Sequence, residues 1–284
     1  MKTINPSELS PMQVQMILQT AVSPRPIALA STIDKNGNVN LSPFSFFNLF
    51  SSNPPILIFS PARRVRDNST KDTLHNVLEV PEVVIGNVNF DMVQQVSLSS
   101  TEYETGVDEF IKSGLTKNPS ELVKPPLIAE SPVNFECKVI EVKPLGNEGG
   151  AGNLVICEVL KIHIKEEFLN EEGNLDQKKL DLVSRLGGNW YGRTSAETLF
   201  EVPKPLVTKG IGFDQLPSEI RNSKIFTGND LGMLANVEQL PEGNFTADEN
   251  LHLEAQKLLL EGKIEEAWFL NKIKNGSSII SIQI

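Results

Sequence analysis

The feature that most constrains the fold is an alternation of apolar and polar residues near the middle of the chain. Val133, Phe135, Cys137 and Val139 are separated by single polar residues, and a period of two places apolar side chains on one face of a β-strand. The glycine-rich run GNEGGAGN at 146–153 then leads into the apolar run LVICEVLKIHI at 154–164. The sequence therefore predicts an antiparallel hairpin here.

A second hairpin is predicted nearer the N-terminus. The β-prone runs IALASTI at 27–33 and VNLSPFSF at 39–46 flank an Asn36-Gly37 turn. Further candidate strands are PILIFS at 55–60, EVVIGNV at 82–88 and LDLVSRL at 180–186. These six or seven short strands do not alternate regularly with helices, so we expect a mainly β fold, a closed or half-closed antiparallel barrel.

Two helices are predicted among these strands. The first begins at SPMQ, 10–13, where a capping serine, a proline at the first helical position and a box-closing glutamine occur together, and it ends before SPRP at 23–26. The second follows a basic loop and has apolar residues at 74, 77 and 78, with Thr70, Asp72 or Thr73 as candidate caps.

The character of the chain changes after VPKP at 202–205. TADE at 246–249 is a capping box, and an apolar stripe follows it at 251, 255, 258 and 259. Gly262 is expected to end that helix, and KIEEAWFLNKI at 263–273 to form another. We expect a barrel domain at 1–205 and a loop-rich, helical C-terminal extension at 206–284.

Net charge and composition make some classes of binding partner improbable for this chain. The 284-residue chain has a net charge of -10 and a pI near 5.0, which disfavours nucleic acid and anionic membranes as partners. A small anionic ligand would therefore need a local basic site. The chain has no apolar run of membrane-spanning length and no apolar stretch of a signal peptide at its start, so we expect a cytoplasmic protein.

Motifs of several other chemistries are absent from the sequence. Cys137 and Cys157 are the only cysteines, both in alternating patterns, and we expect reduced core residues rather than a disulfide or zinc site. The three histidines lie in separate segments, so no metal site is expected. The sequence has no phosphate loop after a strand, no nucleophile elbow and no HExxH.

Two segments carry side chains suited to a ligand. SPFSFFNLFSS at 42–52 mixes phenylalanines with serine and asparagine, which is consistent either with core packing or with an aromatic wall edged by polar groups. SPARR at 60–64 and KDT at 71–73 concentrate positive charge in an acidic chain. They are suited to a phosphate, or to ion pairs with Asp67 and Asp72 on a solvated loop.

Four motifs taken together resemble those of the flavin reductase family, which has the FMN-binding split-barrel fold, a Greek-key barrel. They are SPRPIALASTIDKNGNVNLSPFSFFN at 23–48, PPILIFS at 54–60, KDTLHN at 71–76 and RLGGNWYGR at 185–193. The resemblance covers residues 20 to about 200. It says nothing of residues 206–284.

The resemblance implies three groups of FMN-binding residues. They are Ala30, Ser31, Thr32, Ser45, Phe46, Phe47 and Asn48 around the ring, Ser60, Arg63, Arg64, Lys71 and Thr73 at the phosphate and ribityl end, and Arg185, Gly187 and Gly188 beside the isoalloxazine. Many family members have histidine in place of Arg185, and arginine cannot relay protons at neutral pH. An electrostatic role is therefore expected for Arg185. Trp190 and Tyr191 either stack or pack.

The function implied by the resemblance is an FMN-dependent NAD(P)H:flavin reductase that transfers hydride from NADH or NADPH to flavin. The flavin would carry the chemistry, so no side chain need act as nucleophile or general base. The resemblance also implies a homodimer. Two alternatives remain: an FMN-binding electron-transfer protein without significant NAD(P)H oxidase activity, and an interaction protein with a vestigial barrel.

Overall fold

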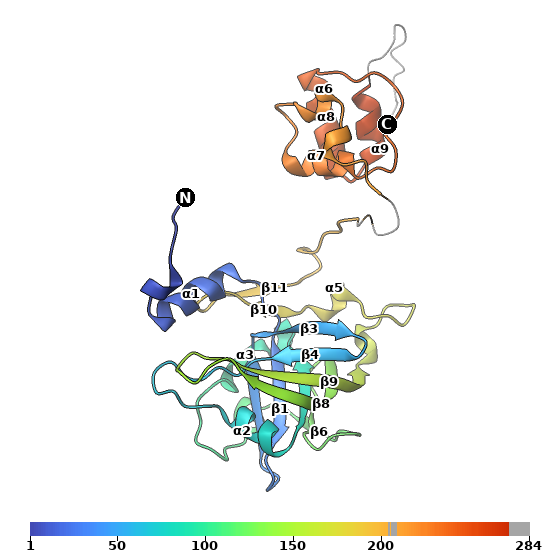
Figure 1. The fold of residues 1–284 in the computed structure, drawn as a ribbon. Coiled ribbons are helices and arrows are strands. Elements are labelled where there is room, and N and C mark those ends of the chain that lie inside the picture. The colour runs from blue at the N-terminus through green and yellow to red at the C-terminus, as the bar shows by residue number, and fades with distance from the viewer. Residues whose placement is uncertain (204, 206–208, 273–284) are drawn as a thin grey trace. The chain divides into compact units, whose positions relative to one another are not determined.

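The computed structural model describes residues 1–203, 205 and 209–272 of the chain (Figure 1). The chain divides into two units, residues 1–200 and 201–284, which are described separately. No helix among the described residues is both long enough and apolar enough to cross a membrane.

A seven-stranded antiparallel sheet is the frame of the first unit. Its strands, in spatial order, are β2 (Val39–Phe44), β1 (Ala28–Ile33), β5 (Glu82–Asn87), β8 (Val133–Pro144), β9 (Asn153–Ile164), β4 (Pro55–Phe59) and β3 (Phe47–Ser52). Strands β4 and β9 run across the direction of β1, so the sheet is strongly curled (Figure 1). Within the described part of the chain, β2 and β3 at its two edges do not pair.

The fold is therefore mixed α/β with an open, curled sheet. The sheet has seven strands, which agrees with the predicted six or seven, but it does not close into a barrel. Both predicted hairpins are confirmed, β1 with β2 and β8 with β9. In the first turn Asp34 Oδ1 accepts hydrogen bonds of 2.8 Å from the amides of Asn36 and Asn38, and Gly37 has a φ of 91°, which glycine adopts without strain.

Hydrophobic cores lie on both faces of the central strands. On β1 and β5, Ala30 and Ile85 belong to one core, whereas Leu29 and Val84 belong to the other. Helix α2 (Asp72–Glu79) packs on the first core, and helices α3 (Val93–Leu98) and α4 (Glu109–Ser113) on the second. The two cysteines are free and buried in the first core, as predicted, and burial raises the pKa of Cys137 to about 12.

The prediction of how a helix begins is right for α1 (Pro11–Ala21) and wrong for α2. Helix α1 begins with the expected capping box, in which the Ser10 hydroxyl and the Gln13 side chain bond each other's backbone amides. Helix α2 begins after Lys71 without any side-chain cap, so the prediction of a cap at Thr70, Asp72 or Thr73 is wrong. The remaining short helices of this unit are η1 (Pro6–Glu8), η2 (Phe90–Met92), η3 (Glu166–Phe168) and α5 (Gln177–Leu180).

Two short hairpins lie beside the main sheet. They are β6 (Lys117–Asn118) with β7 (Leu127–Ile128), and β10 (Val183–Arg185) with β11 (Tyr191–Arg193). The strand predicted at 180–186 is thus present as β10, but its partner is β11 rather than a strand of the barrel. Strand β3 was not predicted, because its segment is too polar for a plain core strand.

The second unit is helical. Its elements are η4 (Phe213–Gln215), α6 (Ser218–Arg221), α7 (Gly228–Ala235), α8 (Glu249–Leu260) and α9 (Ile264–Leu270). Trp268 is buried at its centre and donates a 3.2 Å hydrogen bond from Nε1 to the Leu234 carbonyl. The predicted helix pair is confirmed as α8 and α9, although Asp248 rather than Thr246 caps α8. Residue 273 of the predicted second helix lies outside the described residues.

Candidate functional site

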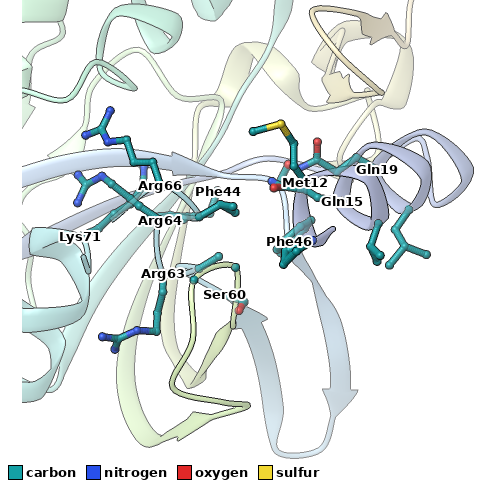
Figure 2. Close-up of a pocket in the computed structure, with 18 of the residues that line it drawn as sticks. Met12, Gln15, Gln19, Phe44, Phe46, Ser60, Arg63, Arg64, Arg66 and Lys71 are labelled. Carbon is teal, nitrogen blue, oxygen red and sulfur yellow. The ribbon is translucent and has the colours of Figure 1, made fainter. Parts of the chain in front are cut away.

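One cavity in the first unit has a volume of about 1000 Å³ and is formed by segments that are distant in sequence (Figure 2). Its walls come from residues 6–19, 43–46 and 60–71, with Glu102 and the pair Gly149 and Gly150. Ligand cavities in proteins reach about 1000 Å³. The space is therefore sufficient for a nucleotide-sized molecule.

Phe46 gives one part of this cavity an aromatic surface. It lies between β2 and β3 and is 40% exposed, whereas Phe44 is buried and its ring centre lies 5.2 Å from that of Phe59. Phe44 thus belongs to the core and also lines the cavity, whereas Phe46 gives the cavity an exposed aromatic surface. The Phe46 carbonyl accepts a 2.8 Å hydrogen bond from the Ser60 amide, which joins the aromatic segment to the start of the basic loop.

The basic loop brings positive charge to the other part of the cavity. Arg64, Arg66 and Lys71 point to the same side in Figure 2. The Arg64 Nη1 atom donates to Ser69 Oγ at 2.9 Å and to the Thr70 carbonyl at 3.0 Å, which fixes its guanidinium. The aromatic segment and the cationic residues therefore line a single cavity.

Lys71 is a partly buried member of this group of cations. Its Nζ lies 3.4 Å from Ser42 Oγ and 5.2 Å from the centre of the Phe44 ring. Burial lowers the pKa of Lys71, and the charge of Arg64 lowers it further. No carboxylate forms an ion pair with Lys71 in the described part of the chain, so an anionic ligand would relieve the cost of burying this charge.

Arg63 lines the cavity but its guanidinium turns away from the other cations (Figure 2). Its Nε donates to Asn68 Oδ1 at 2.6 Å, and its Nη2 to the Asn68 carbonyl at 3.0 Å. Arg63 therefore stabilises the loop conformation, and its head group does not join the cationic cluster.

The glycine-rich loop between β8 and β9 holds the basic loop in place. The Arg63 amide donates to the Ala151 carbonyl at 2.8 Å, and the Gly150 amide donates back to the Arg63 carbonyl at 2.9 Å. A Cβ atom on Gly149 would lie 3.0 Å from the Arg64 carbonyl oxygen, closer than real Cβ atoms approach without a shift. The glycines thus permit the backbone contact that positions Arg64.

Helix α1 forms a further wall, with Met12, Gln15 and Gln19 toward the cavity (Figure 2). None of its residues is buried. Its C-terminal end is held by Arg25, a buried residue whose guanidinium donates to the carbonyls of Gln19, Val22 and Leu186, the last two at 2.8 and 3.0 Å. Burial lowers the pKa of Arg25, and the charge of Arg185 lowers it further.

The three predicted residues on β1, Ala30, Ser31 and Thr32, do not line this cavity. All three are fully buried. Thr32 Oγ1 accepts a 3.1 Å hydrogen bond from Asn76 on α2. Because β1 is an inner strand covered on both faces, these side chains are enclosed in the protein interior.

Phe47, Asn48 and Thr73 also lie outside the cavity lining. Phe47 begins β3 and packs against the first core, while Asn48 is exposed and accepts a 2.8 Å hydrogen bond from the Leu49 amide. Thr73 is buried and donates to Asn40 Oδ1 at 2.6 Å. Of the predicted residues, those that do line the cavity are Ser45, Phe46, Ser60, Arg63, Arg64 and Lys71.

Arg185, Gly187 and Gly188 lie in and beside the β10–β11 hairpin and do not line the cavity. Arg185 Nη2 donates to the Gly188 carbonyl at 2.8 Å, and its guanidinium lies 4.5 Å from the centre of the Tyr191 ring. A Cβ on Gly187 would lie 2.2 Å from Thr20 Oγ1. The hairpin therefore packs against α1. Trp190 of the same hairpin is 76% exposed and so is not packed in the interior.

Several residues that line the cavity were not predicted from the sequence: the α1 wall, Arg66, Glu102 and the glycine pair of the β8–β9 loop. Arg25, which does not line the cavity but holds α1, was not predicted either. Arg66 could have been found from its place in the same basic run. The sequence carries no local signal for Arg25 or Glu102, since their partners are remote in the chain. No group of three metal-ligating side chains occurs in the ranges that the structure describes.

Residues 21–181 match the family model described as flavin reductase like domain. An uncharacterized protein of Halalkalibacterium halodurans is 38% identical over 208 residues, which is 72% of this chain and 98% of that protein.

Two solved structures extend the comparison. Nitrilotriacetate monooxygenase component B from Bacillus cereus is 28% identical with a TM-score of 0.65, and the match covers 72% of this chain and 98% of that one. Pseudomonas fluorescens 2-nitrobenzoate 2-nitroreductase is 27% identical with a TM-score of 0.63, with 74% and 100% covered.

Proposed function

Because the chain belongs to the flavin reductase-like family, and a similar solved structure has a split-barrel domain, we propose that it is an FMN-dependent NAD(P)H oxidoreductase. Family membership supports a flavin-related oxidoreductase activity. The finer proposal is hydride transfer from NADH or NADPH to flavin, in the cavity formed by Phe46 and the basic loop, within a flavin reductase-like domain at 1–205.

The residues of the cavity fit FMN. The ligand has a flat, largely apolar ring and a phosphate with nearly two negative charges, and the cavity offers Phe46 in one part and Arg64 and Lys71 in another. Lys71 is a partly buried cation that lies against Ser42 and the Phe44 ring, and no carboxylate is in ion-pair contact with it among the described residues. This observation carries the proposal.

We assign the cavity residues to two roles. Ser60, Arg64 and Lys71 would hold the phosphate and ribityl end, because hydroxyl, guanidinium and ammonium groups all donate to phosphate oxygens. Ser45, Phe46 and helix α1 would bound the ring and limit its contact with water. When bound, FMN would supply the group that accepts hydride.

The other predicted residues receive supporting roles in this proposal. Ala30, Ser31, Thr32 and Phe47 fill the interior next to the cavity, and Thr73 fixes the start of α2 through Asn40. Arg185, Gly187 and Gly188 shape the hairpin that supports α1. Asn48 stays on the exposed side of β3.

A homodimer and a cytoplasmic location are further parts of the proposal. Leu49 and Phe50 on edge strand β3 are 58% and 64% exposed, and among the described residues β3 has a sheet neighbour on one side only. Apolar side chains on an open strand edge favour pairing with another chain. This supports a dimer that places β3 at its interface.

The test is a flavin spectrum of the purified full-length protein, followed by oxidation of NADH and of NADPH with added FMN. We expect flavin uptake and turnover with at least one nicotinamide. A colourless protein that takes up no FMN would contradict the proposal. Bound FMN that only a protein donor can reduce would instead favour the electron-transfer alternative.

A further inference from the structure

Glu102 places a carboxylate among the cations of the cavity. Its oxygen atoms accept a 3.0 Å hydrogen bond from Arg64 Nε and a second bond from Arg66 Nη2. Glu102 lines the same cavity as Arg64 and Lys71, and its negative charge also acts on Lys71. The cationic part of the cavity therefore already contains one anion supplied by the protein.

This carboxylate uses donors that a phosphate would need. The Arg64 Nη1 atom is bonded to Ser69 and Thr70, and the Nε atom to Glu102. A phosphate that binds Arg64 side-on must therefore take the place of the Glu102 carboxylate or lie against it. Two anions in contact repel each other, so the second arrangement is unfavourable.

Glu102 is held in this position by the two arginines alone. Its side chain is 42% exposed and makes no other polar contact among the residues that the structure describes. It belongs to the connection between α3 and α4, which is anchored elsewhere, by Thr105 on Asp72 and by Asp108 at the start of α4. A change of side-chain rotamer can therefore free the arginines without unfolding the loop.

We propose that Glu102 is an internal competitor for the phosphate end of the cavity and sets how strongly the chain distinguishes phosphorylated from unphosphorylated flavins. This inference rests on the proposed function, because it takes the cationic cluster as the phosphate site. The carboxylate would weaken FMN binding and shorten its residence. Such a site suits a flavin that enters as substrate and leaves reduced, rather than one that stays bound.

The experiment compares the full-length protein with E102Q and with the matched control E104Q. Glu104 lies two residues away, is exposed and forms no ion pair among the described residues. FMN and riboflavin are titrated separately by flavin fluorescence, and inorganic phosphate is used as a competitor. Because two partly exposed ion pairs are removed, we expect E102Q to bind FMN about fivefold more tightly. Riboflavin affinity should not change in either variant.

The possible outcomes separate the two proposals. If the unmodified protein binds neither flavin, the proposed function fails and Glu102 has no phosphate to compete with. If it binds FMN but E102Q binds FMN equally well, the competitor role is wrong. If E102Q binds FMN more weakly, Glu102 instead orients the arginines. E102D, which keeps the charge on a shorter side chain, should lie between the two. Inorganic phosphate competes for the same donors, so its inhibition constant against FMN should fall in E102Q relative to the unmodified protein.

Discussion

The basic loop and helix α1 form facing parts of one cavity but are held in different ways. The loop is fixed by a dense set of bonds, from Arg63 to Asn68, from Arg64 to Ser69 and between its backbone and the β8–β9 loop. Helix α1 has no buried residue. The proposed phosphate end is thus organised by the protein's own contacts, whereas the α1 wall, proposed to lie near the flavin ring, depends on few contacts.

Loss of the Arg25 side chain should produce the largest difference in local stability between α1 and the basic loop. Arg25→Met keeps an apolar stem but removes the donors to three carbonyls, and charged hydrogen bonds of this kind are worth about 2 kcal/mol or more. We expect amide exchange in residues 11–22 to become about thirtyfold faster, a loss of about 2 kcal/mol of local stability. Hydrogen exchange with mass spectrometry measures this directly.

The control for that variant is Arg221→Met, the same truncation at an exposed site in the second unit. It should leave exchange in α1 unchanged. Equal protection of α1 in Arg25→Met and in the unmodified protein would show that the helix is held by other contacts. Exchange in the 60–71 loop should stay slow in both variants, because its bonds do not involve Arg25.

A substitution at Lys71 tests the role of the basic loop. Lys71→Met removes a partly buried charge from the proposed phosphate site, and a charge-assisted hydrogen bond contributes about 1.5–3 kcal/mol. We expect FMN to bind about thirtyfold more weakly, with little change for riboflavin. The affinity ratio of the two flavins, from fluorescence titration, isolates the phosphate contribution.

Lys35→Met is the matched control, since Lys35 is an exposed lysine paired with Glu79 away from the cavity. Its FMN affinity should equal that of the unmodified protein. A parallel loss of FMN and riboflavin binding in Lys71→Met would mean that Lys71 supports the cavity structurally and does not recognise phosphate.

Gly187 allows α1 to lie close to the β10–β11 hairpin. In Gly187→Ala the new Cβ would meet Thr20 Oγ1, and overpacking of this kind costs about 1–3 kcal/mol. We expect faster exchange in α1 and partial recovery in the double variant with Thr20→Ala. Gly232→Ala adds a Cβ with no neighbour within 4 Å and should not affect α1, whereas an unrescued double variant would exclude this clash as the cause.

The sequence predicted the parts of the fold whose signals are local. The β1–β2 and β8–β9 hairpins follow from alternation and turn residues that lie within about thirty positions. Arg64 and Lys71 could be singled out because positive charge is concentrated there in an acidic chain. In each case the pattern and its structural consequence belong to one short segment.

What the sequence did not predict depends on remote contacts. Ser31 and Thr32 have the polarity of site residues, yet they are enclosed because β1 is an inner strand covered by helices on both sides. Arg25 bonds Leu186, 161 positions away. Glu102 bonds an arginine 38 positions away. No periodicity or spacing rule reports such pairings.

The smallest expected effect is a pH dependence confined to the cationic wall. Burial and the charge of Arg64 lower the pKa of Lys71, so its ammonium loses its proton at a lower pH than that of an ordinary lysine. As pH rises through that lowered pKa, FMN affinity relative to riboflavin should fall. Lys71→Arg keeps its charge over the same range and should abolish the decline. If the ratio of FMN to riboflavin affinity stays constant in the unmodified protein up to the ordinary lysine pKa, Lys71 remains well solvated. The basic loop, which is proposed to bind phosphate, and the exposed helix α1 would then differ less than the structure suggests.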